Sequence, residues 1–251
     1  MLFRSTDREG GVWIRSSEKL LLWRPGSARF VRQDRDLPAS GYCADLYFDR
    51  KGRLLLPTDQ GLARLRDGRW ERIDSSRGLP SDSACSVMQD REGSLWVGLW
   101  GYGVARWQGY ERWEAWTHAE GLPSDIVWAV RRDTGGALWI GTDRGLARLD
   151  PRSGAVRSWS SAQGLPGEKV RAIAMGADGG VWIGAAPGGV ARLEASDGYR
   201  RVQRFGVESG ITNPRVNGML MAPDGRLWVS TSDGLFRGDA RGRTPDRKSV
   251  V

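Results

Sequence analysis

The sequence predicts an all-β protein built from repeated units of four antiparallel strands. A tryptophan in a short apolar run, replaced once by Leu55, recurs in steps of 41 to 46 residues. A segment similar to Gly-Leu-Ala-Arg follows it in phase, and a turn similar to Gly-Leu-Pro precedes most repeats. A period of this size, with several short strands in each repeat, is typical of the blades of a β-propeller.

The clearest copy of the repeat lies at residues 135–149. Gly135 and Gly136 can adopt the positive φ that a tight hairpin turn needs. The apolar run 138–140 contains an aromatic and a β-branched residue and suits a strand. A second turn at 143–145 leads into the alternating segment 146–149, which predicts the next strand. In the whole fourth unit we expect strands at 126–131, 138–141, 146–150 and 156–160.

Six units can be recognised in residues 1–245 by these markers. Their bounds are 1–35, 36–77, 78–120, 121–163, 164–209 and 210–245. The sixth unit ends before its last strand, and the first begins directly at a first strand. Because closed propellers avoid open sheet edges, we expect a fragment of a larger propeller, either seven-bladed or double.

Residues 246–251, Asp-Arg-Lys-Ser-Val-Val, break the repeat where a strand is due. They resemble the translation of a common sequencing-library adaptor. We therefore interpret them as a disordered tail that arises from sequencing or cloning and exclude them from the fold. The alternative is an ordinary charged terminus.

Most tryptophans have a structural explanation. A four-stranded sheet cannot bury both of its faces alone, whereas stacked blades can. The tryptophans at the repeated strand position are therefore predicted to form the core between blades: Trp13, Trp96, Trp139, Trp182 and Trp228.

Composition limits the possible functions. The net charge is +8 and the pI is about 10.1, but arginine is scattered through all six units. Scattered charge favours an arginine-rich proteome over a nucleic-acid partner, because clustering is what makes a basic patch informative. No apolar run is long enough to span a membrane, and the first residues lack the apolar core of a signal peptide.

Cysteine and histidine are rare, with two cysteines and one histidine in the chain. Cys43 and Cys85 lie at matching places in adjacent units. Matching strands of neighbouring blades are usually too far apart for a disulfide, so two small buried residues are favoured over a bridge. With so few ligands we expect no metal and no cofactor.

Residues 121–133, followed by Gly-Ala-Leu-Trp-Ile-Gly-Thr and Gly-Leu-Ala-Arg-Leu-Asp, resemble the two-component regulator propeller repeat. The resemblance extends over residues 1 to about 240. It implies the periplasmic, ligand-sensing region of a bacterial signalling receptor that is membrane-anchored and dimeric. It also implies a histidine kinase or diguanylate cyclase output, which is absent here. Polysaccharide fragments are the best-known ligands of such receptors, and the repeat itself carries no catalytic residues.

Two alternatives stay open. One is a scaffold propeller that binds another protein. The other is an enzyme similar to the virginiamycin B lyase propeller, which uses a histidine and a metal. His118 lies in a loop and is interpreted as a solvated surface residue, and carboxylates such as Asp49, Asp90, Asp133 and Asp224 are explained by turns. The sequence therefore favours a protein that is not an enzyme.

A candidate ligand site can be predicted from residues that the repeat does not require. The third unit has Trp100 and Tyr102 where its neighbour has a plain turn. Trp128 and Arg171 occupy equivalent positions in the next two first strands, where side chains are expected to face the central channel. Aromatic rings beside a guanidinium suit an oligosaccharide with an acidic group. Alternatively, Trp100 and Tyr102 only cap the interface between blades.

Overall fold

The structure is a computed structural model, and it describes residues 3–16, 19–41, 45–109, 112–206, 211, 215–222 and 224–239. Within these residues the chain is almost entirely β. Its helices are four single turns of 3-10 helix: η1 (Ser75–Arg77), η2 (His118–Glu120), η3 (Ser161–Gln163) and η4 (Ala195–Asp197). In this described part of the chain, no helix has the length and apolar character needed to cross a membrane. Residues 246–251, interpreted above as a tail, lie outside it.

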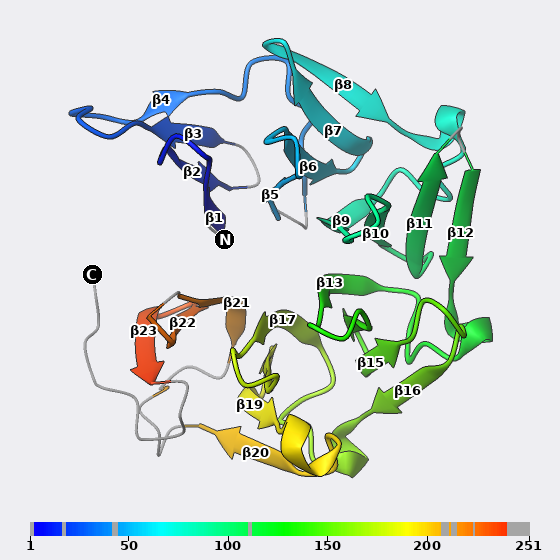
Figure 1. The fold of residues 1–251 in the computed structure, drawn as a ribbon. Helices are drawn as coiled ribbons and strands as arrows, with labels where there is room; N and C mark the ends of the chain where they lie inside the picture. The colour runs from blue at the N-terminus through cyan, green and yellow to red at the C-terminus, as the bar shows by residue number, and fades with distance from the viewer. Residues whose placement is uncertain are drawn as a thin grey trace. The chain divides into compact units, whose positions relative to one another are not determined.

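The chain divides into two compact units, and the N-terminal unit comprises residues 1–117 with 125–127. It holds three antiparallel sheets of four strands each (Figure 1). The first sheet contains β1 (Phe3–Thr6), β2 (Val12–Arg15), β3 (Leu20–Trp23) and β4 (Val31–Arg32). The second contains β5 (Tyr47–Phe48), β6 (Leu54–Thr58), β7 (Gly61–Arg66) and β8 (Arg69–Ile73). The third contains β9 (Ala84–Gln89), β10 (Leu95–Leu99), β11 (Val104–Gly109) and β12 (Arg112–Trp116).

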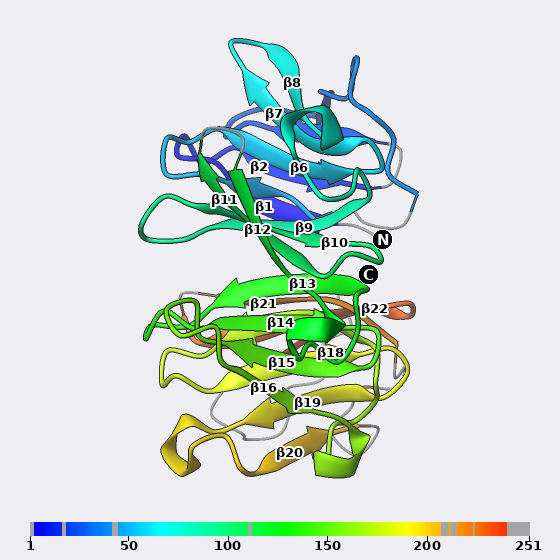
Figure 2. The ribbon, with the colours of Figure 1, turned by 90° about the vertical axis from the view of Figure 1, so that its right-hand side faces the viewer.

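The C-terminal unit comprises residues 118–124 and 128–251. The fourth sheet contains β13 (Val127–Arg132), β14 (Leu138–Thr142), β15 (Gly145–Leu149) and β16 (Val156–Trp159), which lie side by side in this order (Figure 2). The fifth contains β17 (Val170–Met175), β18 (Val181–Ala185), β19 (Gly189–Leu193) and β20 (Val202–Phe205). The sixth has three strands in the described residues: β21 (Val216–Met221), β22 (Arg226–Thr231) and β23 (Gly234–Asp239).

These six meandering sheets confirm the predicted all-β propeller of four-stranded antiparallel blades. In the fourth blade, each predicted strand boundary agrees with the observed one to within one residue. The agreement follows from the turn residues: Gly136 has φ 97° and Gly145 has φ 139°, values that favour glycine.

The core of the third, fourth and fifth blades contains a repeated pair of aromatic rings. The tryptophan of the second strand packs on an aromatic residue of the fourth strand in the same blade. Ring centroids are 5.2 Å apart for Trp96–Trp116, 5.3 Å for Trp139–Trp159 and 5.1 Å for Trp182–Phe205. The predicted core tryptophans are buried in the first, third, fourth and fifth blades, and Trp228 is half-buried.

A carboxylate fixes the buried tryptophan in three blades. An aspartate in the turn before the second strand accepts a hydrogen bond from the indole Nε1 six residues later. The pairs are Trp13–Asp7 (2.8 Å), Trp96–Asp90 (2.8 Å) and Trp139–Asp133 (3.1 Å). In the fourth blade Arg148 of the third strand adds an ion pair to the same carboxylate oxygen, with Nη2 at 3.1 Å. These aspartates are therefore more than turn residues, since each satisfies an indole donor that is buried with its ring.

Glycines in the second strands let neighbouring blades approach closely. A Cβ added at Gly141 would lie 2.5 Å from the backbone oxygen of Val170 in the next blade. At Gly184 it would lie 2.4 Å from Cγ1 of Val216. Only glycine fits such contacts, so the Trp-Ile-Gly segment brings the first strand of the next blade directly against the second strand.

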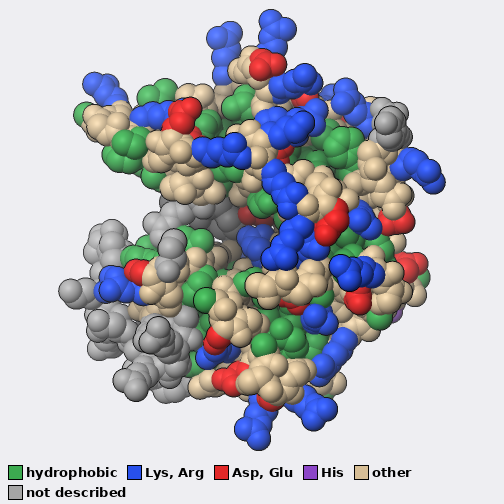
Figure 3. Space-filling model, viewed as in Figure 1, with side chains coloured by type: hydrophobic (Ala, Val, Ile, Leu, Met, Phe, Trp, Pro, Cys, Tyr) green, Lys and Arg blue, Asp and Glu red, His purple; other side chains and the backbone are tan. Residues whose placement is uncertain are grey.

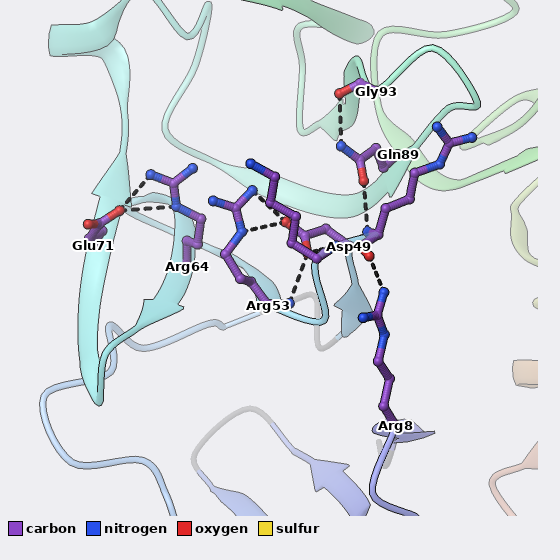
Figure 4. A network of polar contacts seen from close by, with 9 residues as sticks. Arg8, Asp49, Arg53, Arg64, Glu71, Gln89 and Gly93 are labelled. Atoms are coloured by element: carbon purple, nitrogen blue, oxygen red, sulfur yellow. Dashed lines mark hydrogen bonds and ion pairs between the residues drawn. The ribbon is translucent and has the colours of Figure 1, made fainter.

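Polar contacts join the hairpins of the first three blades (Figure 4). The Arg8 guanidinium donates to the backbone oxygen of Arg50, whose own backbone N donates to Gln89 Oε1 at 2.9 Å. In the second blade, Asp49 is paired with Arg53 at 2.7 Å. This network accounts for several charged residues of the N-terminal unit as links within and between blades.

Cys85 is disulfide-bonded, so the interpretation of the cysteines as two unpaired small residues is wrong. Cys43, the one other cysteine of the chain, lies outside the described residues. The physical reason is the close approach of first-strand positions in neighbouring blades. Asp45 Oδ2 accepts a hydrogen bond from the backbone N of Val87 at 3.4 Å, so positions 42 residues apart do come into contact.

Lys and Arg side chains are spread over the face shown in Figure 3, with acidic side chains between them. Several basic groups of the chain are held in ion pairs with acidic residues of the same blade, such as Arg64 with Glu71 at 2.6 Å. The positive charge of the chain is therefore partly neutralised locally, and its total says little about a partner.

Candidate functional site

Three first strands share an irregularity at the same position. In β17, Val170 pairs with Ala185 and Ala172 with Gly184, so Arg171 is an extra residue between two ladder positions. The same shift leaves Asn217 extra in β21 and Cys85 extra in β9. Such bulges re-aim a side chain and are common beside binding sites. The bulge therefore changes the direction of one side chain in each of these three strands.

Trp128 and Arg171, both predicted as site residues, lie together in the C-terminal unit. Trp128 stands one residue after Val127, as Arg171 stands one residue after Val170. The Arg171 guanidinium carbon lies 4.4 Å from the centroid of the Trp128 ring. A guanidinium at this distance makes a cation–π contact, which holds the charge in place while leaving its edges available.

Two residues that the sequence did not single out complete this cluster. Asp143, in the turn between β14 and β15, accepts a hydrogen bond from Trp128 Nε1 at 3.3 Å. The same oxygen, Oδ1, pairs with Lys169 Nζ at 3.0 Å. Lys169 Nζ is also 5.5 Å from the centroid of the Trp128 ring. One carboxylate oxygen therefore serves both the indole and the ammonium group.

Arg171 lacks a carboxylate of its own. Its Nε is buried and has no hydrogen-bond partner among the described residues. Burial lowers the pKa of Arg171 from its usual range, Asp143 opposes this shift, and the nearby Arg215 reinforces it. Arginine nevertheless remains protonated at neutral pH. The cluster therefore contains a partly desolvated cation that could bind a hydrogen-bond acceptor.

Trp100 and Tyr102, the other two predicted site residues, belong to the N-terminal unit, in the loop between β10 and β11. The backbone N of Trp100 donates to the oxygen of Ser83 at 2.8 Å, and its side chain is half-buried. Tyr102 is 53% exposed. The loop tolerates these residues because glycines at 101 and 103 adopt positive φ. The role of Trp100 and Tyr102 in binding stays a prediction.

Sequence reasoning singled out Trp128 and Arg171 but not their neighbours Asp143, Lys169 and Arg215. A signal for Asp143 was present, since the turn between the second and third strands lies at the same edge as the start of the first strand. No sequence pattern indicates Lys169, because it precedes its strand and its partner comes from the neighbouring blade.

His118 is the one histidine of the chain. It is exposed, as expected, and its Nδ1 lies 2.8 Å from the backbone oxygen of Leu122. Among the described residues, no group of three or more His, Cys, Asp or Glu side chains could hold a metal ion.

The family described as two component regulator propeller matches the sequence at residues 78–101, 121–144 and 210–233. Each match begins at a Gly-Leu-Pro turn or its weaker form and ends after the second strand. The chain carries two-component regulator propeller repeats. The resemblance stated from the sequence is therefore confirmed, and the Trp128 cluster lies within and beside the matched repeats.

Solved structures with the same fold include extracellular domains of bacterial receptors. One is the extracellular domain of a hybrid two-component system of B. thetaiotaomicron, with TM-score 0.78 and 20% identity over 99% of this chain and 36% of that one. A second such domain from the same organism gives TM-score 0.69 and 19% identity over 98% of this chain and 40% of that one. The chain with these repeats thus spans about two fifths or less of the receptor structures that it matches.

Virginiamycin B lyase from Staphylococcus aureus is also similar in fold, with TM-score 0.73 and 13% identity over 98% of this chain and 83% of that one. Identities this low show the shared propeller fold alone. Among curated proteins, none matches the sequence significantly.

Proposed function

We propose that the chain is the ligand-sensing propeller of a bacterial signal-transduction receptor, acting as input to a kinase or cyclase module outside this chain. The repeat family and the fold shared with extracellular receptor domains support this proposal. The observation that carries it is the Trp128–Arg171 pair, a partly buried cation held at a strand bulge without an acceptor of its own. A structural arginine would be neutralised, as Arg148 is by Asp133.

We place this sensor outside the cytoplasm, in the periplasm. The disulfide bond of Cys85 supports the placement, because disulfides form and persist in oxidising compartments. The extracellular origin of the similar receptor domains points the same way.

The chain acts by binding and not by catalysis in this proposal. The similar lyase is known in a catalytically inactive form in which a histidine is replaced by alanine. Here the one histidine, His118, is exposed and bound to a neighbouring backbone oxygen. Among the described residues, this histidine does not support the chemistry of a lyase-like enzyme.

The ligand that we propose is an oligosaccharide with acidic groups. The contact residues that we propose are Trp128 and Arg171 in the C-terminal unit, and Trp100 and Tyr102 in the N-terminal unit. The Arg171 guanidinium can donate hydrogen bonds to the acidic group, and the exposed Tyr102 ring offers a face for a sugar. In a receptor that carries this chain as its sensor, the double variant Trp100→Ala/Arg171→Ala should abolish the response to an acidic oligosaccharide. The melting temperature should change by only a few degrees, because both side chains are partly exposed.

A wild-type response from the double variant would show that the site lies elsewhere. The matched control is Arg144→Ala, which removes an exposed arginine from the turn beside Asp143. The control should leave the response unchanged.

A further inference from the structure

The cluster in the C-terminal unit carries more positive than negative charge. Lys169 and Arg171 flank Val170 at the start of β17, and Arg215 precedes β21 of the next blade. Arg215 is close enough to Arg171 to lower the pKa of its guanidinium. The carboxylate that the structure places among them is that of Asp143. Cations so close together repel one another and gain from any further anion.

The carboxylate of Asp143 is unevenly shared among the described residues around it. Asp143 Oδ1 contacts Lys169 Nζ at 3.0 Å and Trp128 Nε1 at 3.3 Å, whereas no hydrogen bond or ion pair links it to Arg171. Trp128 is half-buried between these groups, with the Arg171 guanidinium over its ring at 4.4 Å. This ring face is therefore covered by a cation. Trp128 therefore helps to position Arg171 through this contact.

We propose that Lys169 and Arg171 clamp the acidic group of the ligand, and that Asp143 is a built-in competitor for that group. This inference rests on the proposed function and names the ligand chemistry of the same site. In the empty site, Asp143 neutralises Lys169. On binding, Lys169 exchanges the Asp143 carboxylate for the carboxylate or sulfate ester of a sugar, and the Arg171 guanidinium gains an anionic partner that the described residues do not give it. The competition keeps affinity modest and rejects neutral sugars and weakly held ions.

The test uses this chain and three monosaccharides that share the glucose ring. Glucuronate carries a carboxylate, glucose 6-sulfate carries a sulfate ester, and glucose is neutral. Binding is followed by NMR at the Trp128 indole N–H, assigned with Trp128→Phe. We expect both acids, and not glucose, to shift this signal. The ratio of the two affinities distinguishes a carboxylate ligand from a sulfate ester. Arg171→Gln should weaken binding of the preferred acid about tenfold or more, which is the usual effect of losing one charge-assisted contact.

Asp143→Asn is the decisive variant. It keeps an acceptor for the indole but removes the competing charge, so it should tighten acid binding about five- to tenfold. Arg144→Gln removes one positive charge from the same turn, and we expect its affinity to stay within about twofold of wild type. Weaker or unchanged binding in Asp143→Asn would overturn the competitor role. An equal loss in Arg144→Gln and Arg171→Gln would overturn the clamp and indicate attraction to the net charge of the chain.

The two proposals fail separately. If neither acid binds here but the receptor still responds to an acidic oligosaccharide, the clamp is wrong and the sensor function stands. If the acids bind with the expected variant pattern but the receptor variants respond as wild type, the clamp stands and its part in sensing is wrong.

Discussion

Two tryptophan–arginine pairs of the C-terminal unit are alike in composition and differ in what surrounds them. Trp139 is fully buried, and Arg148 lies 5.8 Å from its ring centroid. The carboxylate of Asp133 binds both partners, the indole at 3.1 Å and the guanidinium at 3.1 Å. Tyr199 of the next blade closes the arrangement with its ring centroid 4.8 Å from that of Trp139.

The pair of Trp128 and Arg171 is half-buried and lies at the opposite end of the first strand from the Asp133 turn. Here the carboxylate, Asp143, binds the indole and Lys169 and leaves Arg171 without an ion pair in the described structure. The position of one carboxylate thus separates a pair that holds the blade together from a pair that we propose binds a ligand. Residue type alone does not make this distinction.

The largest effect should come from removing the buried ring. Trp139→Ala should destabilise the chain by about 3–5 kcal/mol, because it leaves a large cavity between two blades. Trp128→Ala should cost about 1 kcal/mol or less, since that ring is half exposed. Chemical unfolding of both variants measures the difference, and equal losses would show that the two pairs are both structural.

Removing the carboxylates of Asp133 and Asp143 should also destabilise the chain to different extents, but the difference should be smaller than for the two tryptophans. Asp133→Ala leaves Trp139 Nε1 and Arg148 without their acceptor and should cost about 2–3 kcal/mol. Asp143→Ala should cost about 1 kcal/mol or less, because Lys169 and Trp128 can turn toward water. Thermal unfolding at neutral pH checks both values. A larger loss of stability for Asp143→Ala than for Asp133→Ala would show that Asp143, and not Asp133, is the structural carboxylate.

The smallest effect is a gain in the fifth blade, which lacks the aspartate of its neighbour. Gly176 stands six residues before Trp182, and the buried Nε1 of Trp182 and Nε of Arg192 have no partner among the described residues. Asp178 reaches Arg192 from two residues further along.

The double variant Gly176→Asp/Asp178→Gly recreates the fourth-blade turn and should stabilise the chain by about 1 kcal/mol. Gly176→Asp alone is the control, because its Cβ would lie 2.5 Å from Asp178 Oδ1 and should bring no gain. If the double variant melts below wild type, the aspartate–tryptophan bond is not what stabilises these turns.

Much of the fold could be predicted from the sequence because its signals are local. The recurring tryptophan and the turn glycines, such as Gly136 and Gly145, set strand type and strand ends within one blade. Even the aspartate–tryptophan bond was accessible, since Asp90–Trp96 and Asp133–Trp139 repeat the same spacing. That spacing was instead attributed to turn chemistry alone.

The contacts between blades could not be predicted in the same way. Lys169 forms an ion pair with Asp143, which lies 26 positions earlier in the sequence. This ion pair depends on how closely the first strand of one blade packs on the neighbouring blade. The same unpredicted closeness explains the error at Cys85, where matching positions were expected to lie too far apart. Arg171 was singled out because it occupies the first-strand position expected to face the central channel. That its Nε has no partner among the described residues became visible only with its neighbours in place.

We propose that Arg148 is structural and that Arg171 binds a ligand, and one paired experiment separates these two roles. The melting temperature and the affinity for glucuronate are measured for Arg148→Gln and Arg171→Gln under the same conditions. This division of roles predicts that Arg148→Gln lowers the melting temperature and keeps the affinity, whereas Arg171→Gln keeps the melting temperature and loses about tenfold or more in affinity. A drop in melting temperature for Arg171→Gln as large as that for Arg148→Gln, with the affinity unchanged, would contradict it.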